Sequence, residues 1–201
     1  MKSHDRQLLG RALVMPWRSA WVALRQIVRV VRRLQFAECG RDARFDPFGS
    51  YTPMRKMHFG SHTFVGPGAR ITAHEGFFLD ESAVVGPGLL VIGGDHNIAT
   101  VGIDILDVKT GGENLPVVVE RDVYMGARVT LLKGVVVGEG SVIGACSVVT
   151  KSVPPFTIAA GSPCRPLRPR FSPDELRRHL AAGRSRATYE EVIEGWRAGG
   201  V

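Results

Sequence analysis

Histidine is the side chain in this sequence best suited to proton transfer near neutral pH. A free imidazole has a pKa of about 6.5, so a neutral ring can take the proton of a hydroxyl group. Four of the six histidines lie between residues 58 and 96: His58, His62, His74 and His96. The other two, His4 and His179, are expected to be solvated. A lone histidine is more often structural than catalytic, so its surroundings must decide.

A strict repeat of six residues runs from Val119 to Pro154. It reads VERDVY, MGARVT, LLKGVV, VGEGSV, IGACSV and VTKSVP. The first position is always aliphatic: Val119, Met125, Leu131, Val137, Ile143 and Val149. A helix would repeat every 3.6 residues and an amphipathic strand every two, so a period of six fits neither. It predicts a parallel β-helix in which each unit supplies one short strand and one turn.

The same frame precedes His96. The units FGSHTF, VGPGAR and ITAHEG begin at Phe59, two extra residues follow within HEGFF, and LDESAV, VGPGLL and VIGGDH resume at Leu79. His96 closes the last of these units. The pattern then stops from Asn97 to Pro116 and resumes, so we expect residues 97–116 to form an excursion loop. Long loops in compact domains are usually functional, and we expect this one to form a wall of an active site.

The order of these motifs carries a family resemblance. The segment GGDH followed by the repeat and the tail GACSVVTKSVPPFTIAAGSPCRPL resembles the hexapeptide-repeat acyltransferases, in particular sugar O-acetyltransferases and xenobiotic acetyltransferases. The resemblance covers about Phe36 to Phe171. It implies a mainly β fold, a left-handed parallel β-helix in which three hexads make one triangular coil. It also implies a homotrimer with active sites between subunits.

The resemblance implies acetyl-CoA as cosubstrate and His96 as the general base that deprotonates an acceptor hydroxyl, without a covalent acyl-enzyme. The turn at Gly126 and Ala127 matches the place of the backbone donor that stabilises the thioester oxygen. Further positions match the family's coenzyme A track: Ala145 and Thr150 beside the pantetheine arm, and Lys151, Arg165 and Arg168 around the nucleotide phosphates. Lys and Arg are the side chains that phosphates favour.

The group that orients His96 is left open by the sequence. Asp95 is adjacent, but neighbours in a strand point to opposite faces. A backbone carbonyl, Asp104 or Glu113 is an equal alternative.

Positive charge is concentrated in residues 1–35. The chain has 26 Lys and Arg and 19 Asp and Glu, and residues 1–35 hold eight of the basic residues and one of the acidic ones. The remainder is therefore neutral. A helix is expected over residues 16–35 with Pro16 in its first turn. Its apolar face comprises Trp17, Ala20, Trp21, Leu24, Ile27, Val28, Val31 and Leu34, with five arginines on the other side.

Arginines interrupt every apolar run of this arm, which argues against a transmembrane span or a signal peptide. Two roles remain open for the apolar face: peripheral contact with an anionic membrane, or packing on the β-helix or a neighbouring subunit. Nucleic acid is not an expected partner, because no groove-reading motif accompanies the basic residues.

The expected organisation is therefore a basic helical arm at 1–35, a β-helix at 36–169 and a helical segment at 170–201. In the last segment, Ser172, Pro173 and Glu175 have the spacing of a capping box, which predicts a helix over about 173–182. A shorter helix is expected near Tyr189–Trp196. Three cysteines without paired spacing indicate neither a disulfide framework nor a zinc site and favour a reducing cytoplasm.

Two other functions compete with acetyl transfer to a sugar hydroxyl, as in a glycan or lipid-linked sugar. The γ-type carbonic anhydrases share the fold and bind zinc through histidines spaced H-x4-H, whereas His58 and His62 here are spaced H-x3-H. A non-catalytic β-helix scaffold is the second alternative. No metal is expected, and the acceptor itself cannot be read from the sequence.

Overall fold

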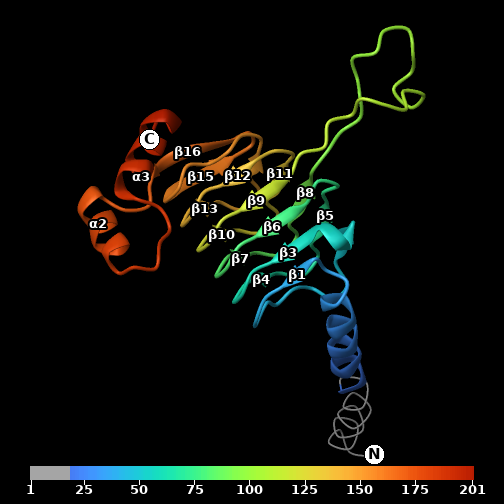
Figure 1. The fold of residues 1–201 in the computed structure, drawn as a ribbon, viewed down its shortest axis with the longest axis horizontal. Helices are drawn as coiled ribbons and strands as arrows, with labels where there is room; N and C mark the ends of the chain where they lie inside the picture. Colours follow the sequence, from blue (N-terminus) through green and yellow to red (C-terminus); the bar gives the residue numbers. More distant parts are fainter. Residues whose placement is uncertain (1–18) are drawn as a thin grey trace, which may run out of the picture.

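The computed structural model describes residues 19–201 and has short strands wound into a solenoid of three sheets, whose strands pair in parallel except for the last two strands of the chain, which are antiparallel to each other (Figure 1). Sheet A contains β1 (Glu38–Cys39), β3 (Met57–Phe59), β6 (Phe77–Leu79), β9 (Val117–Val119) and β12 (Val136–Val137). Sheet B contains β4 (Phe64–Val65), β7 (Val84–Val85), β10 (Tyr124–Met125), β13 (Val142–Ile143), β15 (Thr157–Gly161) and β16 (Cys164–Pro169). Sheet C contains β2 (Ser50–Thr52), β5 (Arg70–Thr72), β8 (Leu90–Ile92), β11 (Thr130–Leu132) and β14 (Val148–Val149). The predicted parallel β-helix is confirmed.

The core of the solenoid is built from the first position of each hexad. All six aliphatic side chains predicted to point inward, from Val119 to Val149, are fully buried. Short β-branched strands suit this arrangement, because alternate side chains leave one row inside and one outside. Removing one of them, as in Leu131→Ala, would cost about 2 to 5 kcal/mol.

The coils are not all of one length. Phe64 pairs with Val84, twenty residues later, whereas Tyr124 pairs with Val142, eighteen residues later. The extra residues of the early coils lie in the turns from sheet C to sheet A, at 53–56 and 73–76, and at the second of these the sequence HEGFF breaks the hexad frame. The excursion loop leaves the register intact, since Phe77 in β6 pairs directly with Val117 in β9.

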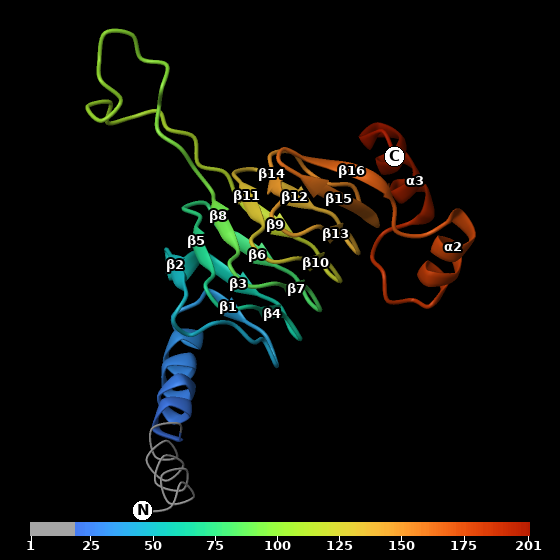
Figure 2. The same cartoon turned by 180° about the vertical axis from the view of Figure 1, so that it is seen from behind.

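The N-terminal helix, over residues 19–33, lies at one end of the solenoid (Figure 2). Three of the four arginines of residues 19–33 face the first coil: Arg32 donates to the Gly49 carbonyl at 2.7 Å, and Arg33 to the Gly40 carbonyl at 2.9 Å. Arg25 lies 3.7 Å from a carboxylate oxygen of Asp46.

The apolar side of this helix is exposed instead. Its exposed side chains are Trp21, Val22, Leu24, Ile27, Val30, Val31 and Leu34, and only the Trp21 ring stacks on the coil, against Phe48. The apolar face therefore does not pack on the chain's own β-helix to any large extent, which leaves membrane contact and packing on a neighbouring subunit as its open roles. The expected helix start at Pro16 and Trp17 lies outside the described residues. Among residues 19–201, no helix has the length and hydrophobicity to cross a bilayer.

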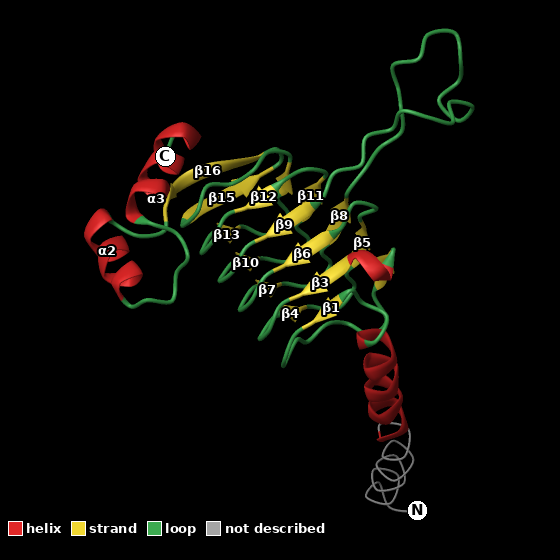
Figure 3. Ribbon diagram, viewed as in Figure 1, coloured by secondary structure: helices red, strands yellow, loops and turns green. Residues whose placement is uncertain are grey.

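Two helices cover the other end of the solenoid, α2 (Pro173–Ala181) and α3 (Tyr189–Gly199) (Figure 3). The predicted capping box is present: the Glu175 amide donates to the Ser172 hydroxyl, and the Ser172 amide donates to the Glu175 carboxylate. The Trp196 indole donates to the Pro155 carbonyl at 2.8 Å, which fixes α3 against the last coil.

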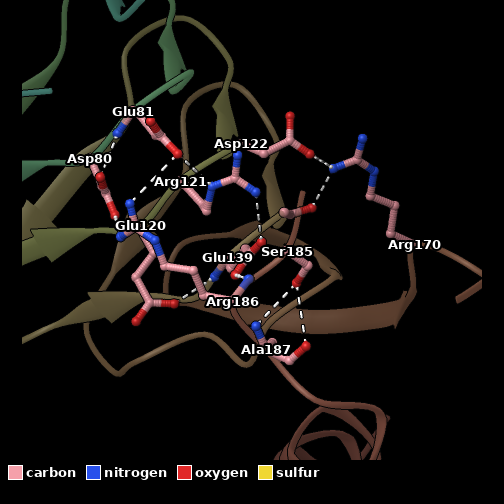
Figure 4. Close-up of polar contacts among 11 residues, drawn as sticks. Asp80, Glu81, Glu120, Arg121, Asp122, Glu139, Arg170, Ser185, Arg186 and Ala187 are labelled. Carbon is pink, nitrogen blue, oxygen red and sulfur yellow. Dashed lines mark hydrogen bonds and ion pairs between the residues drawn. The ribbon is translucent and has the colours of Figure 1, made fainter. Parts of the chain in front are cut away.

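Ion pairs also hold this C-terminal segment against the turns between sheets A and B (Figure 4). Arg121 lies 3.1 Å from Glu81 and 3.3 Å from the buried Glu139. Glu139 also accepts the backbone N–H of Arg186, whose guanidinium lies 2.6 Å from Asp80. A buried carboxylate is tolerated when several donors surround it, so these contacts are structural.

Candidate active site

The predicted site residues lie along two edges of the solenoid that border sheet C. The turns that lead from sheet C to sheet A, at 53–56, 73–76, 93–116, 133–135 and 150–152, form what we call the His96 edge. The turns that lead from sheet B to sheet C, at 66–69, 86–89, 126–129 and 144–147, form the Ala127 edge. Sheet C separates the two edges within one chain.

His96 lies on its edge directly after β8, where the excursion loop begins, and its side chain is exposed. Within the described residues its imidazole makes no hydrogen bond to the protein. The loop extends away from the body of the chain (Figure 1). Its apolar side chains are exposed, with Val101 96% and Leu106 81% accessible. The loop therefore does not wall a site on its own chain, and any surface that it encloses must include another molecule.

The two arms of the loop pair at its base. The Asp95 amide donates to the Glu113 carbonyl at 3.1 Å, and the Glu113 amide donates to an Asp95 carboxylate oxygen at 3.3 Å. Lys133, one coil further along the same edge, places its ammonium 2.6 Å from the Asp95 carboxylate and 2.5 Å from that of Glu113. The Lys133 hydrogen bond lowers the pKa of the Asp95 carboxyl, and the two carboxylates raise the pKa of Lys133.

This arrangement bears on the orientation of His96. The sequence left Asp95 and Glu113 as two of the candidates to orient the imidazole by a hydrogen bond. In the structure both carboxylates are bonded to Lys133 instead. Asp104 lies in the exposed part of the loop.

The Ala127 edge has a repeated backbone geometry. The nitrogen atoms of Pro87, Ala127 and Ala145 each lie 2.7 to 2.8 Å from the point where a Cβ would project from the glycine of the preceding coil. The three nitrogens therefore occupy equivalent positions in successive coils. Only glycine fits below them, because a side chain there would overlap the backbone of the next coil.

Free amide groups follow from this geometry. Pro67 and Pro87 fill the position in the early coils and have no N–H to satisfy. The Gly126 amide donates to the Ile143 carbonyl at 2.8 Å, whereas the amides of Ala127 and Ala145 have no backbone acceptor within residues 19–201. Of the pair predicted to supply an oxyanion donor, Ala127 is the residue whose N–H is available.

The predicted nucleotide contacts separate into two groups. Lys151 and Arg165 line a single cleft of about 660 Å³ at the C-terminal end, between the 151–155 turn, β16 and α3. Arg168 lies further along β16, exposed, with its guanidinium donating to the Pro169 carbonyl. Thr150 is exposed on the His96 edge beside Lys151.

A metal centre has no support in the described part of the chain. No three His, Cys, Asp or Glu side chains gather there in a way that could hold an ion. His58 lies on the face of sheet A, stacked on Phe78 at 4.5 Å, while the exposed His62 lies 3.7 Å from Asp42 in the equivalent turn of the preceding coil.

Comparisons with known proteins agree with the hexapeptide repeat and the β-helix. Residues 116–151 match the family model described as bacterial transferase hexapeptide, six repeats. The galactoside O-acetyltransferase of Lactococcus lactis is 30% identical over 132 residues, 64% of this chain and 61% of that protein. The galactoside O-acetyltransferase of Escherichia coli is 27% identical over 135 residues, 66% of this chain and 64% of that protein.

A solved structure is also similar. It is a hexapeptide-repeat acetyltransferase of Vibrio cholerae in complex with acetyl-coenzyme A, with a TM-score of 0.64 and 26% identity over 72% of this chain and 76% of that one.

The repeat of this chain matches the hexapeptide family model, and the chain is similar to hexapeptide-repeat acetyltransferases. It spans less than two thirds of the length of either curated galactoside acetyltransferase that it matches. Within this hexapeptide-repeat chain the residues predicted for one site lie on two edges, with His96, Thr150 and Lys151 on one and Gly126, Ala127 and Ala145 on the other.

Lys133 is the polar residue of this hexapeptide-repeat chain that sequence reasoning missed. One signal for it was present: in the unit LLKGVV it is the only charged residue, and it falls one coil after the GGDH segment.

Proposed function

We propose that this chain is a CoA-dependent acetyltransferase that transfers the acetyl group of acetyl-CoA to a hydroxyl of a sugar, glycan or lipid-linked sugar. The observation that carries the proposal is the unpaired Ala127 amide at a position that earlier coils fill with proline. Acetyl-CoA fits this chain, because free amides at Ala127 and Ala145 suit a thioester and its pantetheine arm. The basic cleft at Lys151 and Arg165 suits phosphates.

In the proposed reaction, His96 takes the proton of the acceptor hydroxyl as its oxygen forms a bond to the thioester carbon. The Ala127 amide donates a hydrogen bond to the carbonyl oxygen as that oxygen gains negative charge. The carbon–sulfur bond then breaks, and His96 returns its proton to the departing thiolate. The products are the acetyl ester and free CoA, and no group of the protein is acylated.

We propose that two copies of the chain build each site, in a homotrimer. His96 and Ala127 lie on opposite borders of sheet C, so one chain does not bring them to one substrate. The exposed apolar side chains of the excursion loop support the same conclusion, since they need a partner surface. Cyclic symmetry would place the His96 edge of one copy against the Ala127 edge of the next.

The cytoplasm is the proposed compartment, and the three free cysteines support it. Peripheral contact with the inner face of a membrane, through the apolar side of the N-terminal helix, stays a prediction. Arg25, Arg32 and Arg33 face the coil, so within residues 19–35 apolar insertion would contribute more to this contact than attraction of these three arginines to anionic lipids.

The proposal is tested by calorimetric binding of acetyl-CoA with CoA as competitor, followed by turnover of His96→Ala on a panel of sugars. We expect saturable binding by both proteins and a loss of most turnover in the variant, because only the proton transfer is removed. Full turnover by His96→Ala would refute the general base. A folded protein that binds no acetyl-CoA would favour the scaffold function, and bound zinc would favour the carbonic anhydrase function.

A further inference from the structure

Lys133 joins three segments that are far apart in the sequence. It lies in the turn after β11, and its ammonium contacts one carboxylate on the outgoing arm of the excursion loop, Asp95, and one on the returning arm, Glu113. The Lys133 side chain is 27% exposed, so it is partly shielded from water on its edge. Without it the two carboxylates would face each other as like charges across the base of the loop.

The base of the loop determines where the backbone of His96 lies. A Cβ on Gly112 would approach the Asp95 carbonyl oxygen to 2.3 Å and the His96 Cα to 3.6 Å, so the returning arm packs directly against residues 95 and 96. The Leu115 amide donates to the Gly93 carbonyl at 3.0 Å, and Gly94 bridges to Asn114. In the described chain, the imidazole has no hydrogen bond of its own to fix it. The paired arms are what hold the residue.

We propose that Lys133 is a positioning residue for His96: by binding Asp95 and Glu113 together it closes the base of the excursion loop and holds the histidine backbone at the edge of the coil. This inference rests on the proposed function of His96. Lys133 does not touch the acceptor hydroxyl or the thioester. It acts by holding in place a group that must reach its proton within hydrogen-bonding distance.

The contact is stable over the pH range in which an acetyltransferase would be assayed. The lowered pKa of Asp95 keeps its carboxylate charged until the pH falls below the ordinary range of aspartate, and the raised pKa of Lys133 keeps the ammonium charged above the ordinary range of lysine. The groups facing the ammonium are Asp95 and Glu113, with His96 adjacent.

The test compares Lys133→Met, Lys133→Arg and a matched control. Lys56→Met is the control, because Lys56 makes a similar ion pair on the same edge, 3.4 Å from Glu75, away from the loop. We expect Lys133→Met to lower kcat at least 10-fold while KM and Kd for acetyl-CoA change less than twofold. Lys133→Arg should recover most of the activity, and Lys56→Met should behave like the parent protein.

Hydrogen exchange gives a readout independent of catalysis. In Lys133→Met the amides of Asp95 and Leu115 should exchange at least 10-fold faster, with the β-helix amides unchanged. A raised KM for acetyl-CoA with unchanged kcat would overturn the inference, because it would make Lys133 a direct cosubstrate contact. So would unchanged exchange at the two amides. If His96→Ala is inactive and Lys133→Met is fully active, only this inference fails. If His96→Ala is fully active, the general-base role of His96 fails, and if the folded parent protein binds no acetyl-CoA, the proposed function itself fails.

Discussion

Ala127 occupies, in its coil, the backbone position that Pro87 occupies one coil earlier. The two nitrogens lie at the same place relative to the glycine below them, but only Ala127 has a hydrogen to donate. A proline in the early coil costs nothing there, since no acceptor in the coils requires its N–H. The turn therefore accommodates proline at this position in other coils. A substitution of Ala127 by proline can remove its N–H group without a change in the turn.

Ala127→Pro should remove the proposed oxyanion donor while preserving the turn. We expect kcat to fall by about 10²- to 10³-fold, the usual effect of losing one such donor, with a circular dichroism spectrum and melting temperature close to those of the parent. Steady-state kinetics with acetyl-CoA and a reactive sugar measures it.

Pro87→Ala is the reciprocal control, because it adds an amide outside the proposed site and should leave kcat unchanged. Parent-like turnover in a folded Ala127→Pro protein would exclude this amide as the oxyanion donor.

Lys151→Ala and Arg165→Ala should each weaken acetyl-CoA binding about 10-fold, because hydrogen bonds to charged groups contribute about 1.5 to 3 kcal/mol. Calorimetry at two salt concentrations measures the effect, which should shrink at high salt. Arg168→Ala is the comparison, since Arg168 lies outside the cleft that the other two line, and its effect should be smaller. A dominant effect of Arg168 would move the nucleotide site from the cleft to the outer face of β16.

Leu24→Asp with Ile27→Asp should reduce binding to phospholipid vesicles at least 10-fold, because both side chains lie on the exposed apolar side of the N-terminal helix. Vesicle flotation measures it, with Gln26→Asp as the control for added charge. The part of the binding that these two substitutions remove should depend weakly on anionic lipid and on salt, since Arg25, Arg32 and Arg33 face the coil.

Two outcomes would oppose this prediction. Binding that requires anionic lipid and is abolished by salt would mean that basic residues, not the apolar side, meet the membrane. If the parent protein binds no vesicles and the double variant forms a smaller oligomer than the parent, the apolar side of the helix makes contact between copies of the chain instead.

Much of the fold was predictable, because its rules are local. The aliphatic residue at each first hexad position, such as Leu131, has to point inward whatever its neighbours are. The cap formed by Ser172 and Glu175 is likewise complete within four residues. The difference in length between the early coils of twenty residues and the late coils of eighteen follows from two extra residues per coil, which the sequence shows at HEGFF.

The site was less predictable, because its contacts join residues whose separation depends on how coils stack. Lys133 meets Asp95 only because the loop between them leaves the register undisturbed. The inward orientation of Arg32 and Arg33 has a similar origin. Periodicity separates the apolar and basic faces of the helix, but it does not show which face meets the coil. The first coil has no coil before it, so backbone carbonyls such as that of Gly49 can accept hydrogen bonds from an arginine.

The pairing of Phe77 with Val117 has a consequence for how such a protein can change. The strands on either side of the excursion loop pair as they would if its residues were absent, and the arms close on each other at the base. The part of the loop beyond its paired base can therefore vary in length and composition without altering the pairing of β6 with β9. The solenoid is a fixed frame with one insertion, placed where the proposed general base leaves the coil, and changes confined to the far part of that insertion would alter the surface beside His96 while the coils stay as they are.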